Sequence, residues 1–440
     1  MQPMFVTREN GVILSMTRFA MPFRYDLIPM ADTSKWAFRE ELQGEQKTKA
    51  DRSRRDYFTP ETGRVLFERT HWLRLTGSGS GKDDGTPEFS WEFFYKPKDG
   101  DLVGVNAAVA AARLVLFEPS LGEESRLFRC GFLLIDICLS VKGLSAEAGP
   151  ALIHPEILCN FNEVYRYWSR PFDEVLAERG FQSLAVLGAG HEEPFEDLLL
   201  GRCGARRGGD AFRNRWIAWF KRPVELNCDS DHNPPRVKRE KPGEVRTFKL
   251  EPASPEVDGQ GWPAPPADPR AFVWTAVTTP NGDGGVKAFT AWSTKAADIR
   301  NCGAVLKLVN VDSWREGALG ESASAPSAFE KQWLKGRLFL RWARYGTVYG
   351  FSPHSGALLS EQPRKPKEGD DETPPVVSHF FSLYFDQSLL LLYLRASTFG
   401  FSERLSDISS HAANKFANLE AQRELSEEFS ELRYAFALVT

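Results

Sequence analysis

The chain has 440 residues, of which 42% are hydrophobic and 12% are aromatic, and its formal net charge is −4. A chain of this length is expected to divide into two or three domains, and its apolar content excludes a generally disordered protein. The slight acidic excess excludes nucleic acid as the default partner, because proteins that lie along phosphate backbones usually carry a basic excess. No run of 18 apolar residues occurs, so we expect no membrane crossing within these residues.

Strands are expected to dominate the first 150 residues. Three stretches combine β-branched and aromatic residues with turn residues at their ends, at 11–19, 63–77 and 87–96. The runs 112–119 and 128–140 are almost continuously apolar, which predicts two central strands that are buried on both faces.

Helices are expected next. The range 155–180 opens with proline and closes with glycine, and Pro171 inside it predicts a break just before that residue. Two shorter helices are predicted at 193–202 and 210–223.

Pro- and Gly-rich stretches separate the elements predicted between 226 and 375. We interpret four runs as strands, the last of them with a turn: 245–250, 270–279, 302–311 and 347–360. The range 330–346 is predicted to be helical, and everything from Val376 onward is predicted to be helix.

These patterns predict an α+β fold, with a mixed β-sheet domain and packed helices followed by long C-terminal stalk helices. The expected divisions are an α/β domain at 1–225, a second α+β segment with Pro/Gly-rich linkers at 226–375, and a helical stalk at 376–440.

No catalytic motif is complete in the chain. The stretch "TGSGSGKDD" has Thr76 where a phosphate-binding Walker A loop needs glycine, and Asp83 where it needs a hydroxyl side chain. The stretch "GFSPHSG" does not match the GxSxG motif of serine hydrolases, and the seven histidines form no HExxH zinc motif. We therefore expect that the protein is not an enzyme.

The six cysteines form no CxxC pair and have no zinc-finger spacing. In a chain of this size they are expected to be reduced and mostly buried thiols, which points to the cytoplasm.

Two kinds of ligand site can be proposed from the residues. Glu193 and Asp197 are one helical turn apart and could hold a hard cation such as Mg²⁺, although a solvated helix start is the more common explanation. Two arginine–aromatic stretches suit phosphates and bases, although packing of a helix on a sheet is the more common explanation. Their candidate residues are Tyr165, Arg166, Trp168 and Arg170 in the first, and Arg341, Arg344, Tyr345 and Tyr349 in the second.

The last residues carry the spacing of a helical seam. Apolar side chains recur there at steps of 4, 3, 4 and 3, a period of 3.5 residues that is typical of coiled coils and bundles. The five positions are Leu425, Phe429, Leu432, Phe436 and Val439. This seam predicts self-association into a homo-oligomer, and its apolar end predicts that the natural chain continues beyond Thr440.

The order of "YFDQSLLLLYLRASTFGFSERLSDIS" followed by "ELSEEFSELRYAFALVT" resembles the membrane-proximal helices of CorA-like proteins, especially divergent bacterial members found beside CRISPR type III loci. The resemblance implies a pentamer with a cytosolic α/β domain, stalk helices and a membrane region beyond Thr440, on the cytoplasmic side of the inner membrane. The Gly-Met-Asn loop of that family does not occur in these residues.

The resemblance implies a cytosolic sensing domain that couples ligand binding to a pore, in divalent cation transport or in phage defence. For an ordinary member it implies Mg²⁺ as the ligand, and for a CRISPR-linked member a nucleotide second messenger. The alternative is a soluble interaction or scaffold protein with a coiled-coil tail.

Overall fold

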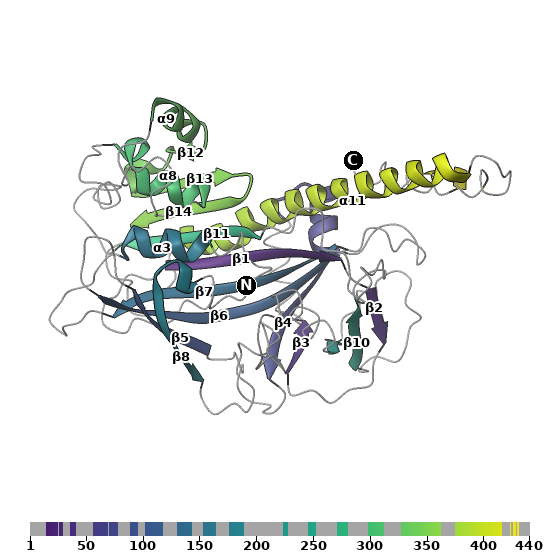
Figure 1. Ribbon diagram of the computed structural model, residues 1–440, viewed down its shortest axis with the longest axis horizontal. Coiled ribbons are helices and arrows are strands. Elements are labelled where there is room, and N and C mark those ends of the chain that lie inside the picture. The colour runs from purple at the N-terminus through teal and green to yellow at the C-terminus, as the bar shows by residue number, and fades with distance from the viewer. Residues whose placement is uncertain are drawn as a thin grey trace.

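The computed structural model describes 15–24, 26–29, 36–40, 56–68, 70–77, 89–95, 102–117, 130–142, 153–163, 176–188, 223–227, 245–251, 271–279, 298–311, 327–361, 375–415 and five helical residues between 423 and 430. It confirms the mixed α+β class, because one large sheet is combined with several helices (Figure 1).

The described strands form one sheet of fourteen. The main path runs in the order β12-β13-β14-β11-β1-β7-β6-β4-β3-β9-β10-β2, and β5 and β8 continue from β6. The strands are β1 Ser15–Arg24, β2 Asp26–Pro29, β3 Trp36–Glu40, β4 Thr70–Gly77, β5 Phe89–Tyr95, β6 Val103–Phe117, β7 Cys130–Lys142, β8 Phe181–Gly188, β9 Pro223–Asn227, β10 Val245–Glu251, β11 Phe272–Thr279, β12 Leu338–Phe339, β13 Thr347–Ser352 and β14 Ser355–Glu361.

The two long apolar runs become the neighbouring central strands β6 and β7, as predicted. They pair antiparallel along most of their length, with a register shift between Val109 and Ala111. Side chains of both strands enter cores on the two faces of the sheet, so Leu133 belongs to one core and Leu134 to the other. Burial on both faces explains why these strands show no alternation of polar and apolar residues.

Helices cover both faces of the sheet. One core cluster joins the sheet to α3 Pro155–Asn162, α8 Gly303–Asn310 and α9 Ala328–Lys335. The other joins it to η1 Arg64–Glu68, which follows α2 Pro60–Gly63, and to α10 Pro375–His379, η6 Phe380–Tyr384 and α11 Phe385–Lys415. In Figure 1, α11 starts against the sheet near β11 and extends beyond it, away from α9.

Helix α3 is entirely buried although it contains a glutamate and two asparagines. Its polar side chains bond to the sheet instead of water. The Tyr95 hydroxyl donates to Glu156 Oε1 at 2.6 Å and accepts from Asn160 Nδ2 at 2.7 Å. Asn162 bonds to the hydroxyls of Thr17 on β1 and Thr275 on β11. These bonds offset the cost of removing the polar groups from water.

Three sequence predictions differ from the structure. The first half of 63–77 is helical rather than extended, and 302–311 is the helix α8 instead of a strand. Val305, Leu306 and Val309 are buried in α8, so packing overrides the β-propensity of its branched residues. The helix predicted over 330–346 ends at Gly336, and the chain continues as β12 and the short 3₁₀ turn η5 Ala343–Tyr345.

Other predictions lie partly or wholly outside the described residues. These include the helices at 193–202 and 210–223, all of 164–175 and most of the stalk after 415. Strands from both 1–225 and 226–375 enter the same sheet, since β1 pairs with β11. Within the described part of the chain, no helix has both the length and the apolar character to cross a membrane.

Candidate functional site

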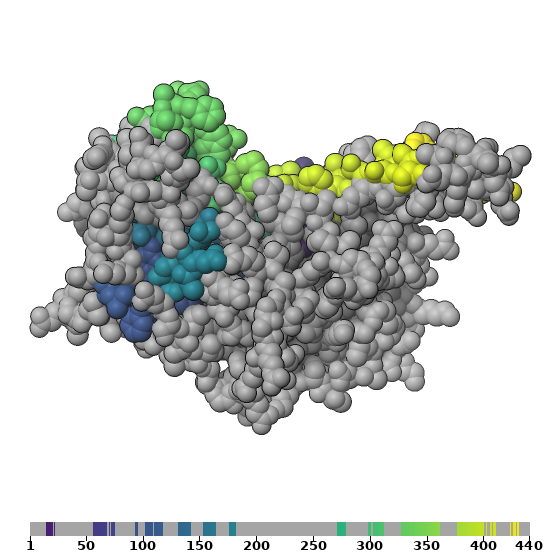
Figure 2. Space-filling view, in the orientation of Figure 1, coloured from purple at the N-terminus to yellow at the C-terminus, as the bar shows by residue number. Residues whose placement is uncertain are grey.

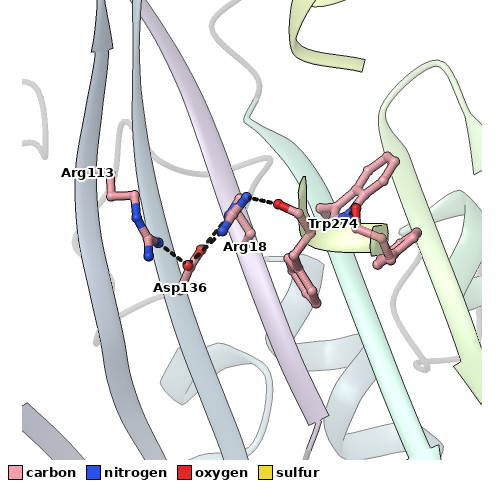
Figure 3. A network of polar contacts seen from close by, with 6 residues as sticks. Arg18, Arg113, Asp136 and Trp274 are labelled. Carbon is pink, nitrogen blue, oxygen red and sulfur yellow. Dashed lines mark hydrogen bonds and ion pairs between the residues drawn. The ribbon is translucent and has the colours of Figure 1, made fainter. Parts of the chain in front are cut away.

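The junction between α10 and α11 is a π-helical turn, η6, that lies against the sheet. A π turn holds one residue more than an α turn and interrupts the regular hydrogen-bond series of the helix, so its carbonyl groups can accept from outside donors. Two sheet side chains supply such donors (Figure 3). Arg18 Nη1 donates to the carbonyl oxygen of Phe381 at 3.0 Å, and Trp274 Nε1 donates to that of Phe380 at 2.9 Å.

Arg18 is held in place by a buried carboxylate on the next strand. Its Nε and Nη2 donate to the two oxygens of Asp136 at 2.6 and 2.9 Å. Arg113 on β6 donates to Asp136 Oδ2 at 2.5 Å, so the carboxylate lies between two guanidinium groups (Figure 3). All three side chains are at most 5% exposed.

The charge state of this triad follows from its surroundings. Burial is the largest single influence on Asp136 and raises its pKa, but the charges and hydrogen bonds of Arg18 and Arg113 together outweigh it. The pKa of Asp136 is therefore lowered, and the carboxylate stays ionised at neutral pH. The first turn of α11 also contains Asp386, a second buried carboxylate.

Aromatic rings enclose both donors. The Arg18 guanidinium lies 4.4 Å from the ring centre of Phe385 and 5.2 Å from that of Phe381. The Trp274 indole stacks on Phe380, with centroids 4.3 Å apart and planes at 18°. On β14, Gly356 pairs with Trp274, and a Cβ there would overlap the indole ring. The glycine therefore lets the indole lie flat across the neighbouring strand.

A group of exposed and partly exposed side chains lies on α9, on η5 and on the loops that flank β12. It consists of three arginines, each lying over an aromatic ring, and is named here the arginine–aromatic surface: Trp333, Arg337, Arg341, Trp342, Arg344 and Tyr345. Guanidinium-to-ring distances are 4.3 Å for Arg337 over Trp333, 5.5 Å for Arg341 over Trp342 and 4.5 Å for Arg344 over Tyr345. Figure 2 shows the segment that carries this surface (green) projecting from the molecule.

A series of ring contacts leads from this region to the π turn. Phe339 on β12 is 57% exposed and meets Phe351 with centroids 5.5 Å apart. Phe351 lies 5.6 Å from Trp274, which stacks on Phe380. The edge of the sheet and the base of α11 thus share one continuous aromatic core.

The structure brings together three of the four residues predicted in the second arginine–aromatic stretch. Arg341, Arg344 and Tyr345 are exposed and adjacent, whereas Tyr349 is 7% exposed and faces the core beside Phe380 and Tyr384. Burial is the main cause that raises the pKa of Tyr349, and the nearby Tyr384 and Tyr57 raise it further. Tyr349 therefore packs in the core against the π turn, and it does not line the arginine–aromatic surface.

The remaining predicted site residues are not described, apart from one seam position. The first arginine–aromatic stretch, the cation candidates and four seam positions lie outside the described residues: Tyr165, Arg166, Trp168, Arg170, Glu193, Asp197, Leu425, Leu432, Phe436 and Val439. The fifth seam residue, Phe429, is helical and 49% exposed. Within the described ranges, no three His, Cys, Asp or Glu side chains are grouped as a metal site.

Sequence reasoning missed the buried triad, although a signal was present. Arg18, Arg113 and Asp136 each interrupt an otherwise apolar strand, in "SMTRFAM", "AARLVLF" and "LLIDICL". A charge within a strand that is buried on both faces needs a partner of opposite charge. Opposite charges on separate buried strands therefore predict that the strands are neighbours.

Comparisons with protein-family models, with curated proteins and with solved structures found no match for this chain. The geometry of the junction and of the arginine–aromatic surface therefore carries the functional argument.

Proposed function

We propose that this chain is a ligand-sensing domain whose output is the C-terminal helix α11. In this proposal it is the cytosolic part of a CorA-like membrane channel or transporter, and α11 begins the stalk that leads to a pore. The ligand is held at the arginine–aromatic surface, and the arrangement of the π turn reports on its presence. Divalent cation transport and phage defence are the two roles that the resemblance implies.

One observation carries the coupling part of the proposal. Arg18 and Trp274, from two neighbouring strands, donate hydrogen bonds to successive carbonyl groups at the base of a 31-residue helix. Both donors are buried, so their bonds are not exchanged with water. A change in the sheet near Trp274 must then be followed by α11 or must break a buried hydrogen bond.

The contacts around Trp274 support a route from the surface. Phe339 is exposed and lies between Arg337 and Arg341 in the sequence, and its ring contact with Phe351 leads to the indole. A ligand that orders or displaces this edge of the sheet would bias the packing of the indole on Phe380. The proposal is thus a shift between two packings of the π turn, driven by the ligand's preference for one of them.

Hydrogen–deuterium exchange of the 385–415 segment tests the coupling. We expect a ligand from a panel of Mg²⁺ and nucleotides to change exchange in α11, and we expect Trp274→Phe to weaken that response while leaving ligand binding intact. Trp72→Phe is the matched control, because it removes an indole that packs against the same core cluster but lies on β4. A response that Trp274→Phe and Trp72→Phe alter equally would contradict the role of the junction.

The membrane part of the proposal is tested on the complete product of the gene. We expect that product in the membrane fraction of expressing cells, and we expect ion flux in vesicles that contain it. A complete product that stays in the soluble fraction would reject the channel and favour the scaffold alternative.

The scaffold alternative has its own supporting observation. Three large apolar side chains of α11 are exposed, Leu391 at 66%, Phe399 at 39% and Leu405 at 45%. An exposed apolar helix face favours association with another helix. Light scattering on this chain gives its mass in solution. A pentamer favours the CorA-like proposal, and a dimer that no ligand alters favours a coiled-coil scaffold.

A further inference from the structure

We propose that the arginine–aromatic surface binds a single strand of nucleic acid. Bases stack on the exposed faces of Trp342 and Tyr345, and phosphates bind the guanidinium groups of Arg337, Arg341 and Arg344. This inference names a ligand class for the surface and so rests on the proposed function, but the binding itself is testable without any response of α11.

The charge of the segment favours a polyanion. Residues 327–346 hold five basic side chains and one acidic one, a net charge of +4 within a chain whose net charge is −4. The acidic one, Glu330, is engaged in the capping box of α9, where its carboxylate accepts from the backbone of Ser327 at 2.7 Å. Among the described residues, no ion pair is found for Arg337, Arg341 or Arg344. Their charges are therefore available to phosphates.

The aromatic geometry favours bases. Trp342 and Tyr345 are 44% and 60% exposed, and their ring centres are 5.8 Å apart with planes at 41°. Large exposed aromatic rings beside arginines are the combination that binds single strands, because every base offers a flat face and every linkage carries a charge. A duplex hides its bases and can use only the charges.

The open shape of the surface favours a strand over a single nucleotide. Sites for small ligands usually bury most of the ligand in a concave pocket. Here the rings and guanidinium groups lie on a projecting segment (Figure 2), so one nucleotide would keep much of its surface in water. A strand gains affinity by making several such contacts at once.

The placement of the surface disfavours a lipid bilayer as its partner. In the proposed function the membrane lies beyond the end of α11, whereas α9 lies at the other end of the molecule (Figure 1). The overall charge of −4 predicts no direct nucleic-acid partner for the chain as a whole. The positive segment 327–346 is a local exception to that overall charge.

Fluorescence anisotropy with a labelled single strand of about ten nucleotides, a length within the usual site sizes of single-strand-binding proteins, measures the binding directly. A mixed-sequence RNA and a DNA strand are compared with the same strand in duplex, with a mononucleotide, with heparin and with vesicles containing phosphatidylserine. We expect single strands to bind more tightly than all of these. Neutralising three phosphates predicts a slope of about −2 for log affinity against log salt.

The variants separate stacking from charge. We expect Trp342→Ala and Tyr345→Ala each to weaken binding roughly tenfold by removing a stacking platform, with the salt slope unchanged. We expect the double change Arg341→Gln and Arg344→Gln to weaken binding and to make the salt slope shallower. Arg423→Gln is the matched control, because Arg423 is exposed and lies outside this surface, paired with Glu427. It is expected to bind like the parent chain.

Four outcomes would overturn the inference. Equal binding of duplex, heparin and single strand would show attraction by charge alone. Binding to vesicles without binding to strands would make the surface a membrane contact, and mononucleotide binding as tight as strand binding would make it a small-molecule site. If the chain unfolds normally in urea but binds no strand, the surface is not a nucleic-acid site. Strand binding without a change of exchange in α11 would instead reject the coupling and keep the binding site.

Discussion

Arg18 and Phe381 are 363 residues apart in the sequence, yet Arg18 Nη1 donates a 3.0 Å hydrogen bond to the carbonyl oxygen of Phe381. The bond joins β1, near the start of the described chain, to the π turn before α11. Since Asp136 holds the same guanidinium by two further bonds, the position of the helix base is determined by three separate segments of the sequence.

Removing the indole N–H of Trp274 should lower the free energy of unfolding by more than the loss of ring volume alone. Trp274→Phe leaves the carbonyl oxygen of Phe380 without its 2.9 Å bond and opens space beside Phe380. We expect a loss of about 2–4 kcal/mol in the free energy of unfolding, measured by urea denaturation. Trp72→Phe, in a partly buried position, is expected to cost clearly less. Equal losses would mean that the hydrogen bond contributes little.

Neutralising the central carboxylate should be more damaging than removing a surface ion pair. Asp136→Asn removes the carboxylate that lies between the buried guanidinium groups of Arg18 and Arg113, and we expect a loss of about 3–5 kcal/mol in the free energy of unfolding. Arg423→Gln breaks an exposed pair with Glu427 and is expected to leave that free energy unchanged within error. Urea denaturation at neutral pH compares the two, and similar losses would contradict the importance of the triad.

The same carboxylate should give the chain a characteristic acid sensitivity. The pKa of Asp136 is lowered in the folded state, so its stabilising effect is complete above the unfolded value of about 3.9 and is lost as the pH falls through the folded-state pKa. We expect the stability difference between the parent chain and Asp136→Asn to shrink as the pH falls below about 4. A difference that is independent of pH in this range would show that the carboxylate is not the titrating group.

Two glycines should respond in opposite ways to the same substitution. Gly356→Ala places a Cβ against the Trp274 ring, and we expect a loss of about 1–3 kcal/mol with a change in tryptophan fluorescence. Gly336 ends α9 with a φ of −76°, and the nearest atom to a Cβ there is 3.7 Å away. Gly336→Ala is therefore expected to be neutral or to stabilise by up to about 1 kcal/mol. A stable Gly356→Ala would mean that the indole can move without cost.

The opposite face of the sheet offers a test of how α3 is held. Tyr95→Phe removes the hydroxyl that joins Glu156 and Asn160, and leaves two buried polar groups without it. We expect a loss of about 2–4 kcal/mol in thermal or urea unfolding. Tyr345→Phe is the matched control, since Tyr345 is 60% exposed and should tolerate the change. Equal stability of the two variants would show that water replaces the hydroxyl.

The elements that the sequence predicted well are those decided by continuous apolar runs. The strands β6 and β7 follow from such runs because both of their faces are buried. The helical character of 375–415 follows from apolar residues that recur on all sides of a long segment. The strand predicted in place of α8 is wrong because "CGAVLKLVNV" is short and rich in valine, a composition that a buried strand and a buried helix share. The structure places α8 against α3 and the sheet, and that contact decides its conformation.

The candidate site was partly predictable for a similar reason. Arg341, Arg344 and Tyr345 are neighbours in the sequence, so their pattern was visible there, whereas the triad joins residues 18, 113 and 136 from three strands. The sequence indicates that these buried charges need partners, and the strand order shows which of them meet. Tyr349 belongs to the same arginine- and aromatic-rich stretch of the sequence, but it lies on β13 and its side chain faces the core.

The extra residue in the π turn between Phe380 and Tyr384 also fixes a rotation. Each residue of an α-helix turns the chain by about 100°, so a turn that is one residue wider changes the side of α11 that is presented to solvent by that angle. If the same residues followed a regular α-helical path instead, Leu391 and Leu405, now exposed, would lie on a different side of the helix without any change in either side chain. The width of this one turn therefore determines which side chains the far half of the helix presents to its surroundings.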